Sequence, residues 1–246
     1  MARDTEQIKF LSCGDSAVTV EFSKEMSEKT NRKIRFLAAK LESEKIKGIC
    51  ESVPTFCSMT IYFNPMIISR KKLEKNVLRM IDSYQEDSAG KKRIFLIPVC
   101  YDGEYAPDME DVCLLTGLSK EEVISIHTST DYLIYMLGFL PGFPYLGGMD
   151  ERIEAPRLDS PRTVIPPGAV GIGGKQTGIY PLASPGGWRL IGRTPVKVYD
   201  PDRERPIVYR AGDYIRFYPI SEAEYKEIAE NRGSVIEVRE ENECLT

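Results

Sequence analysis

The sequence predicts an α+β fold in which a ββαββα unit precedes a β-rich barrel or sandwich. Two observations lead to this prediction. In the first 85 residues, apolar side chains recur at helical spacing in two segments, and a pair of strand-like runs precedes each segment. Beyond residue 160, short alternating runs lie between Gly, Pro and Asp turns. The chain of 246 residues is long enough for one large domain or two ordinary ones.

The first unit begins with strand-like runs over residues 7–12 and 16–22, whose β-branched content predicts a hairpin. A first helix is expected over 25–43, and two further strands over 49–56 and 58–63. The apolar residues of the first helix are Met26, Thr30, Ile34, Leu37 and Leu41. Those of the second helix are Leu73, Val77, Met80, Ile81 and Tyr84. Both helices are expected to cover one face of a sheet.

The segment 85–92, QEDSAGKK, is polar, small and charged, as linkers between domains commonly are. It places the domain boundary between residues 1–88, the α+β domain, and residues 89–246, the barrel domain.

The second unit is expected to start with a strand over 93–101, and Pro107 and Asp108 begin a short helix. Ser119 with Glu122, and Ser221 with Glu224, have the spacing of capping boxes and predict two more helices, the second over 221–231. Further strand-like runs are PVKVYD at 195–200, PIVYR at 206–210, DYIRFYPI at 213–220 and a last short run in 237–246.

Composition excludes several classes of protein. Thirty-three basic and 37 acidic residues leave a net charge of −4 without a basic block, so nucleic acid is not an expected partner. The six cysteines form no CxxC pair, and the first residues lack a signal peptide's apolar stretch, which indicates a cytoplasmic protein with reduced thiols. The apolar run 132–147 is broken by Gly and Pro, so no membrane span is expected.

Two catalytic patterns fail on inspection. The segment 168–178, GAVGIGGKQTG, has Ala169 and Gln176 where a phosphate loop needs Gly and Ser or Thr, so turn glycines are the better interpretation. One histidine and dispersed cysteines do not suit zinc, whereas magnesium held by carboxylates leaves no such pattern and stays open. Any serine–histidine mechanism would use His127, although a lone histidine at a helix end is more often structural.

Most of the glycine and proline of the chain, with the sole tryptophan and the sole histidine, falls in three stretches, 127–148, 155–187 and 188–195. We expect rigid loops there, including a shaped loop at 138–148, GFLPGFPYLGG. Polar donors and an aromatic wall would suit a small carboxylate or amide ligand. The alternative is that the arginines are solvated and the aromatic rings fill a barrel. The donors are Arg157, Arg162, Gln176, Tyr180, Ser184, Arg189 and Arg193, and the wall is Phe143, Tyr145 and Trp188.

The segments GFLPGFPYLGG and PRTVIPPGAVGIGGKQTGIYPLASPGGWRLIGRTP closely resemble the family of 5-oxoprolinase B subunits, also called the KipI family and related to the first-subunit domain of allophanate hydrolase. The resemblance extends through the chain, from Gly14-Asp15 to AGDYIRFYPI near the C-terminus. It implies an N-terminal α+β domain followed by a cyclophilin-like β-barrel domain. It also implies a cytoplasmic heteromer with the C subunit of 5-oxoprolinase, which is KipA-like, and with its A subunit.

The resemblance implies hydrolysis of 5-oxo-L-proline to L-glutamate at the expense of ATP, with or without magnesium, held by the assembled complex. Phosphorylation of the lactam oxygen would make a better leaving group before water attacks. Whether this chain is active alone stays open.

At the motif positions we expect catalytic roles for His127 as base or orienting group, for Gln176 as a hydrogen-bond donor and for Arg193 as an anion ligand. The expected substrate-binding residues are Phe143, Tyr145, Tyr180, Ser184, Trp188 and Arg189.

Other functions stay open at this point. KipI-type members are inhibitors of a sporulation sensor histidine kinase, which they bind without turning over a substrate. Urea or allophanate metabolism is a further enzymatic neighbour. Prolyl isomerase activity ranks last, because it would rest on the cyclophilin-like fold alone.

Overall fold

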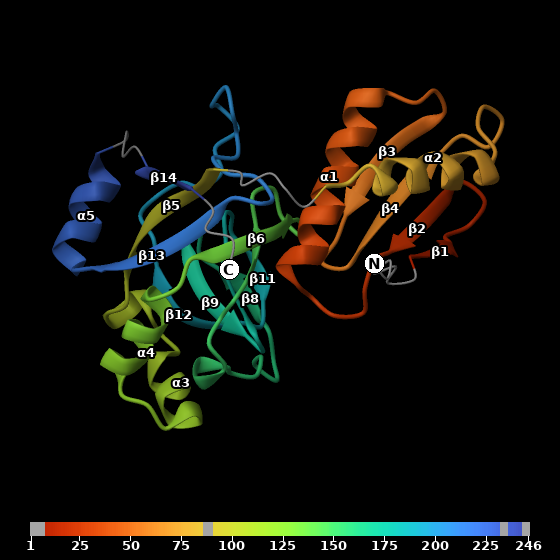
Figure 1. Ribbon diagram of the computed structural model, residues 1–246. Coiled ribbons are helices and arrows are strands. Elements are labelled where there is room, and N and C mark those ends of the chain that lie inside the picture. Colours follow the sequence, from red (N-terminus) through yellow and green to blue (C-terminus); the bar gives the residue numbers. More distant parts are fainter. Residues whose placement is uncertain (1–7, 86–90, 232–235, 243–246) are drawn as a thin grey trace. The chain divides into compact units, whose positions relative to one another are not determined.

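The computed structural model describes residues 8–85, 91–231 and 236–242 and divides into two compact units, residues 1–88 and 89–246 (Figure 1). Each unit has its own hydrophobic core. The predicted α+β class, a small sheet with helices followed by a barrel-like sheet, is confirmed. Most of the expected linker lies outside the described residues.

The first unit has the predicted order ββαββα. Its elements are β1 (Lys9–Ser12), β2 (Ala17–Glu21), α1 (Glu28–Glu44), β3 (Ile49–Pro54), β4 (Ser58–Phe63) and α2 (Arg70–Asp82). The four strands form an antiparallel sheet in the order β1-β2-β4-β3. Sequence neighbours pair as hairpins, and β2 and β4 occupy the centre.

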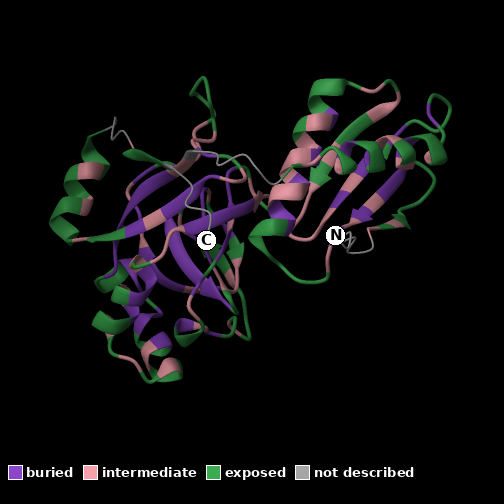
Figure 2. Ribbon diagram, in the orientation of Figure 1, coloured by how far each residue is buried: buried purple, intermediate pink, exposed green. Residues whose placement is uncertain are grey.

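Both helices of this unit cover one face of its sheet. Alternate residues of the central strands, such as Val18 in β2 and Ile61 in β4, are fully buried and form one cluster with Leu37 of α1 and Val77 of α2. The opposite face of each helix is exposed (Figure 2). Helix α1 begins after Ser27, whose side chain accepts a hydrogen bond from the backbone N–H of Thr30, so the helix starts three residues later than predicted.

The second unit is a nearly closed barrel with helices at its ends. Its sheet runs in the order β10-β9-β12-β5-β13-β6-β7, β14 pairs with β5, and β7 and β10 at the two ends of this order also contact each other. Most strand residues of this sheet are buried (Figure 2), and a large cluster of apolar side chains fills the core. The strands are β5 (Lys91–Cys100), β6 (Tyr132–Leu137), β7 (Pro144–Gly147), β8 (Arg162–Ile165), β9 (Ala169–Gly173), β10 (Gln176–Ile179), β11 (Ser184–Gly186), β12 (Arg189–Arg193), β13 (Tyr214–Ile220) and β14 (Val238–Asn242).

The helices of the second unit are α3 (Met109–Thr116), α4 (Lys120–Thr128) and α5 (Glu222–Glu230), with 3₁₀ turns at Gly103–Tyr105 and Glu151–Ile153. Both predicted capping boxes are present, because Ser119 and Ser221 exchange hydrogen bonds with Glu122 and Glu224. The late helix is therefore confirmed to within two residues.

The expectation of rigid loops over 127–148, 155–187 and 188–195 is wrong for about half of these residues, because strands β6 to β12 lie within them. Glycines hide the alternation of several of these strands by leaving room for aromatic rings. A Cβ at Gly147, for example, would lie 2.1 Å from Cε2 of Tyr135. In GFLPGFPYLGG the first six residues and Gly148 lie outside the strands. Pro144 begins β7, and the first residue of a strand is a position that tolerates proline.

Two predicted strands, 195–200 and 206–210, do not form. A single bridge between Tyr199 and Ile207 joins these segments. Each segment begins with a proline, which cannot donate a ladder hydrogen bond, while the buried side chains Val198 and Tyr209 account for the apolar pattern.

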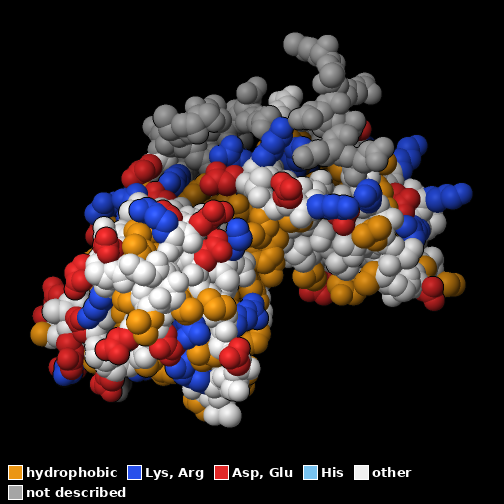
Figure 3. All heavy atoms as spheres, turned by 90° about the horizontal axis from the view of Figure 1, so that it is seen from below, with side chains coloured by type: hydrophobic (Ala, Val, Ile, Leu, Met, Phe, Trp, Pro, Cys, Tyr) orange, Lys and Arg blue, Asp and Glu red, His pale blue; other side chains and the backbone are white. Residues whose placement is uncertain are grey.

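On the face shown in Figure 3, Lys and Arg side chains alternate with Asp and Glu, and small apolar patches lie between them. In the part of the chain that the structure describes, no helix combines the length and apolar character needed to cross a membrane. Cys13, Cys50, Cys57, Cys100 and Cys113 are free thiols.

Candidate functional site

A surface cavity of about 320 Å³ lies in the second unit, over the glycine- and proline-rich motifs. Besides prolines and glycines, its lining consists of Phe139, Phe143, Tyr145, Arg157, Tyr180 and Trp188. These side chains come from segments up to 49 positions apart in the sequence (188 minus 139). The structure thus brings together four of the predicted substrate-binding residues, the aromatic ones. The volume of the cavity is at the small end of the roughly 300–1,000 Å³ typical of ligand pockets.

Phe143 is the centre of the aromatic wall. Its ring is buried and makes edge-to-face contacts with Tyr180 at 5.2 Å and with Trp188 at 5.5 Å between centroids. Tyr145 lies at 5.1 Å in a tilted arrangement. Mutual contacts of this kind hold each ring in one orientation. The rings of the wall are therefore packed by contacts within the chain itself.

The glycines of 168–178 make room for Trp188. Gly173 ends β9 and Gly178 lies in β10, so this segment is a β-hairpin and no phosphate loop. A Cβ on Gly173 would lie 2.4 Å from two atoms of the indole ring, and one on Gly178 would lie 3.1 Å from it. The turn residues Gly168 and Gly174, with φ of +81° and +62°, fit the prediction of turn glycines. The strand glycines let the tryptophan ring lie flat on the sheet.

Arg157 is the only charged side chain among the described residues that line the cavity. Its guanidinium carbon lies 6.0 Å from the centre of the Trp188 ring, on an exposed loop. Tyr180 supplies a phenol. Burial raises the pKa of Tyr180 to about 12, although a hydrogen bond from the Trp188 backbone and the nearby Arg157 charge act in the opposite direction. At neutral pH this phenol is protonated, so it can donate a hydrogen bond.

Phe139 lies at the mouth of the cavity in an unusual backbone conformation. Its φ is +64°, and the N–H of Leu140 donates to the carbonyl of Gly138 at 2.7 Å, which closes a three-residue γ-turn. The side chain is 64% exposed and contacts Phe143 edge-on at 5.7 Å. A non-glycine residue held in this region is strained, and such strain is concentrated at functional sites. Sequence reasoning missed Phe139, because a γ-turn leaves no signature in the sequence.

The predicted arginine ligands lie elsewhere. Arg189 is held by Asp111 at 2.7 Å and by the carbonyl of Pro156 at 3.0 Å, and the Nε of Arg193 donates to the carbonyl of Pro167 at 3.0 Å. These contacts tie β12 to neighbouring loops. Neither arginine lines the cavity.

Gln176 and Ser184 do not line the cavity either. Gln176 begins β10 and pairs with Gly173 across the hairpin. Ser184 begins β11 and is buried, and its Oγ has no hydrogen-bond partner among the described residues. The roles predicted for these two side chains stay predictions.

His127 lies inside the barrel core, fully buried at the end of α4 and stacked on Phe217. Its Nδ1 is 2.8 Å from the hydroxyl of Tyr101 and its Nε2 is 2.9 Å from Oγ1 of Thr177. Because Thr177 donates its proton to the carbonyl of Gly171, it accepts from Nε2–H, and Nδ1 accepts from Tyr101. Every polar atom of this chain of bonds is thus satisfied with a neutral imidazole.

Burial lowers the pKa of His127 to about 3. His127 does not line the cavity, and this geometry supports the structural role that the sequence left open. Its predicted role as a base has no support from the arrangement of its neighbours.

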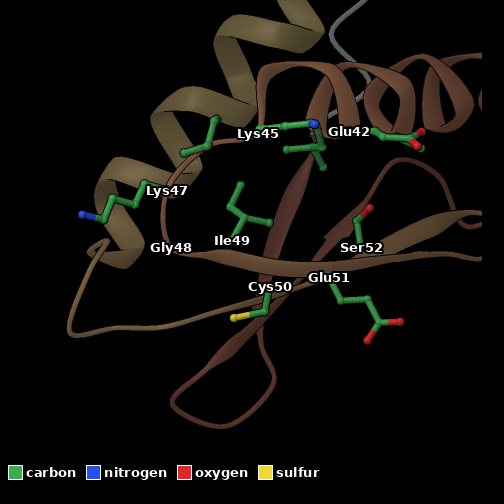
Figure 4. A pocket seen from close by; sticks show the side chains of 11 residues that line it. Glu42, Lys45, Lys47, Gly48, Ile49, Cys50, Glu51 and Ser52 are labelled. Carbon is green, nitrogen blue, oxygen red and sulfur yellow. The ribbon is translucent and has the colours of Figure 1, made fainter.

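A larger hollow of about 610 Å³ lies in the first unit, between the end of α1 and strand β3. Figure 4 shows Ile49 and Ser52 on one side of β3 and Cys50 and Glu51 on the other, as expected where the register shifts after Ile49. Two of the polar side chains at its rim therefore point away from the hollow. It contains none of the predicted site residues, so the smaller aromatic cavity is the better candidate.

Within residues 8–85, 91–231 and 236–242, no three His, Cys, Asp or Glu side chains are grouped so that they could hold a metal ion. The described residues that line the aromatic cavity likewise include no carboxylate ligand.

Comparison with known proteins agrees with the motifs. The family model "Carboxyltransferase domain, subdomain C and D" matches residues 8–209. A Bacillus subtilis protein, named as the B subunit of 5-oxoprolinase, is 45% identical, with 86% of this chain and 92% of that protein aligned. Its namesake in Escherichia coli O157:H7 is 38% identical, over 85% and 94% of the two chains.

Solved structures share the fold. The protein TTHA0988 is 38% identical, with a TM-score of 0.73 over 83% of this chain, which spans only 40% of that longer protein. The urea carboxylase of Kluyveromyces lactis superposes with a TM-score of 0.79 over 95% of this chain and 24% of its own length. At 24% identity this second likeness concerns the fold alone.

Proposed function

The chain belongs to the family of 5-oxoprolinase B subunits, and we propose that it acts as the B subunit of an ATP-dependent 5-oxoprolinase. In this proposal it hydrolyses 5-oxo-L-proline to L-glutamate together with the A and C subunits. The proposal places the chain in an enzyme complex and makes no claim of activity for the chain in isolation.

The observation that carries the proposal is the preformed aromatic cavity. Its walls come from the motifs that mark the family, and its volume of about 320 Å³ suits a small molecule. The alignments with the named B subunits also extend over more than nine tenths of those proteins, so the likeness is that of a whole B subunit.

The described residues of the cavity do not fit ATP. A triphosphate is ordinarily held by several cationic side chains or by the backbone amides of a glycine-rich loop, and this cavity has one guanidinium. The glycine-rich segment 168–178 is a hairpin covered by Trp188. We therefore propose that the nucleotide is bound elsewhere in the assembled complex.

The test is glutamate release from 5-oxoproline and ATP by this chain mixed with its partner A and C subunits, compared with mixtures lacking one component each. We expect release from the complete mixture and none when this chain is omitted. Full activity without it would refute the proposal. A folded, fully assembled but inactive mixture would also refute it and would direct attention to inhibition of a histidine kinase.

A further inference from the structure

The charges around the aromatic cavity restrict its ligand. Among the described lining residues, Arg157 supplies the one positive charge and no Asp or Glu supplies a negative one. A guanidinium binds a carboxylate through two parallel hydrogen bonds, whereas an ammonium group would find no ionic partner here. The lining therefore favours an anion without an ammonium group.

The remaining walls suit a compact ring. Trp188 and Phe143 offer apolar surfaces, and Phe139 extends this surface at the mouth. The protonated phenol of Tyr180 can donate a hydrogen bond to a carbonyl oxygen. A ligand with one carboxylate, one carbonyl and an apolar ring edge would provide a partner for the guanidinium, the phenol and the aromatic walls.

We propose that this cavity binds the five-membered lactam carboxylate itself, with Arg157 holding the carboxylate and the ring lying against Trp188. This inference rests on the proposed function and assigns the substrate site to the B subunit. Arg157 and Phe139 then act as specificity-determining residues.

The same charges distinguish substrate from product. Opening of the lactam creates an ammonium group and a second carboxylate, and the described lining residues include no ionic partner for the ammonium group and no second cation for the added carboxylate. Glutamate therefore binds more weakly than 5-oxoproline, which favours release of the product from this site.

The chain contains a single tryptophan, Trp188, so its fluorescence reports on this cavity alone. We would titrate the purified full-length chain with 5-oxo-L-proline, 2-pyrrolidinone, L-proline and L-glutamate, and confirm binding by calorimetry. We expect 5-oxo-L-proline to change the Trp188 fluorescence in a saturable way. The other three should bind at least tenfold more weakly, because each lacks the carboxylate or carries an ammonium group.

The decisive variant is Arg157→Gln. It should weaken binding of 5-oxo-L-proline about ten- to a hundredfold, the effect of losing a hydrogen bond between charged groups, and leave 2-pyrrolidinone unchanged. Arg157→Lys keeps the charge without the forked geometry and should give an intermediate loss. Arg205→Gln, which removes an exposed arginine of the same unit outside the cavity, is the matched control and should bind like the wild type.

Equal binding of 5-oxo-L-proline by the wild type and Arg157→Gln would overturn the inference, as would the absence of binding by both fluorescence and calorimetry. The outcome is separable from that of the proposed function. If omission of the chain abolishes glutamate release but Arg157→Gln leaves the KM of the complex unchanged, the chain is a B subunit whose substrate binds elsewhere.

Discussion

His127 illustrates how burial decides the role of a residue type that often acts in catalysis. An imidazole titrates near neutral pH in water, but here desolvation lowers its pKa to about 3, and both ring nitrogens are engaged by Tyr101 and Thr177. The imidazole of the folded protein therefore stays neutral at neutral and mildly acidic pH. Its position in the sequence, at a helix end near the family motifs, did not show this.

The buried His127 makes stability depend on pH. Above its ordinary pKa of 6.5 the ring is neutral in both the folded and unfolded chain, so it adds no pH dependence. Between pH 6.5 and 3 only the unfolded chain takes up this proton, so the free energy of unfolding falls by up to about 1.4 kcal/mol per pH unit. No other histidine contributes, because the chain has only one.

Urea unfolding of the wild type and His127→Gln at pH 7 and pH 4.5 measures this effect. The wild type should lose about 2–3 kcal/mol more than the variant over this interval, because glutamine does not titrate. Equal losses in the two proteins would show that the imidazole is protonated in the folded state.

Phe139 shows strain at a single residue. The positive φ costs an L-residue roughly 1–2 kcal/mol, and glycine is free of that cost. Both Phe139→Gly and Phe139→Ala lose the ring. In urea unfolding, the glycine variant should nevertheless have the higher free energy of unfolding, by about 1 kcal/mol. At the neighbouring Leu140, whose φ is not positive, the order should reverse. The same order at both positions would contradict the strained γ-turn.

At the scale of the element, the β9–β10 hairpin and Trp188 form one packing unit. Gly173→Ala would place a Cβ 2.4 Å from the indole ring, and overpacking of this kind costs roughly 1–3 kcal/mol. We expect reduced stability in urea and a changed Trp188 emission. Gly138→Ala is the control, because its Cβ would meet only ordinary contacts from 3.7 Å. Unchanged emission in Gly173→Ala would show that the ring does not lie on this glycine.

Elements with a local signal could be predicted. Helices α1 and α2 follow from helical spacing, and α4 and α5 from their capping boxes. Strands β7, β9, β10 and β11 could not, because glycines and prolines replace some of the alternating side chains from which strands are recognised. The partners that justify those glycines are rings distant in the sequence, and only the folded chain shows them.

At the scale of the whole molecule, each unit has a separate hydrophobic core, which predicts that each folds alone. Residues 1–88 and residues 89–246, expressed separately, should each unfold cooperatively, and the second fragment should keep the Trp188 emission of the full chain. Chemical denaturation, monitored by circular dichroism and by fluorescence, measures the cooperativity of unfolding and the Trp188 emission. A fragment without a cooperative transition would show that its core needs the other unit.

The sequence predicted several residues of the candidate site, but it did not predict which of the candidate residues lie together. The motifs pointed to Phe143, Tyr145, Tyr180 and Trp188, which line the cavity. They pointed equally to a second set, Gln176, Ser184, Arg189 and Arg193, which structural contacts or burial place elsewhere. Residue type alone does not distinguish an arginine that binds a ligand from one that ties a strand to a loop.

By itself the sequence determined the α+β class, the order of the first unit and the family, because periodicity, caps and long glycine- and proline-rich motifs are local properties of the chain. The tertiary structure alone decided that His127 is buried, that Phe139 is strained and that Arg157 is the one charged side chain among the described residues of an aromatic cavity. Desolvation, strain and the convergence of side chains depend on neighbours that are distant in the sequence. They exist only once the barrel has closed.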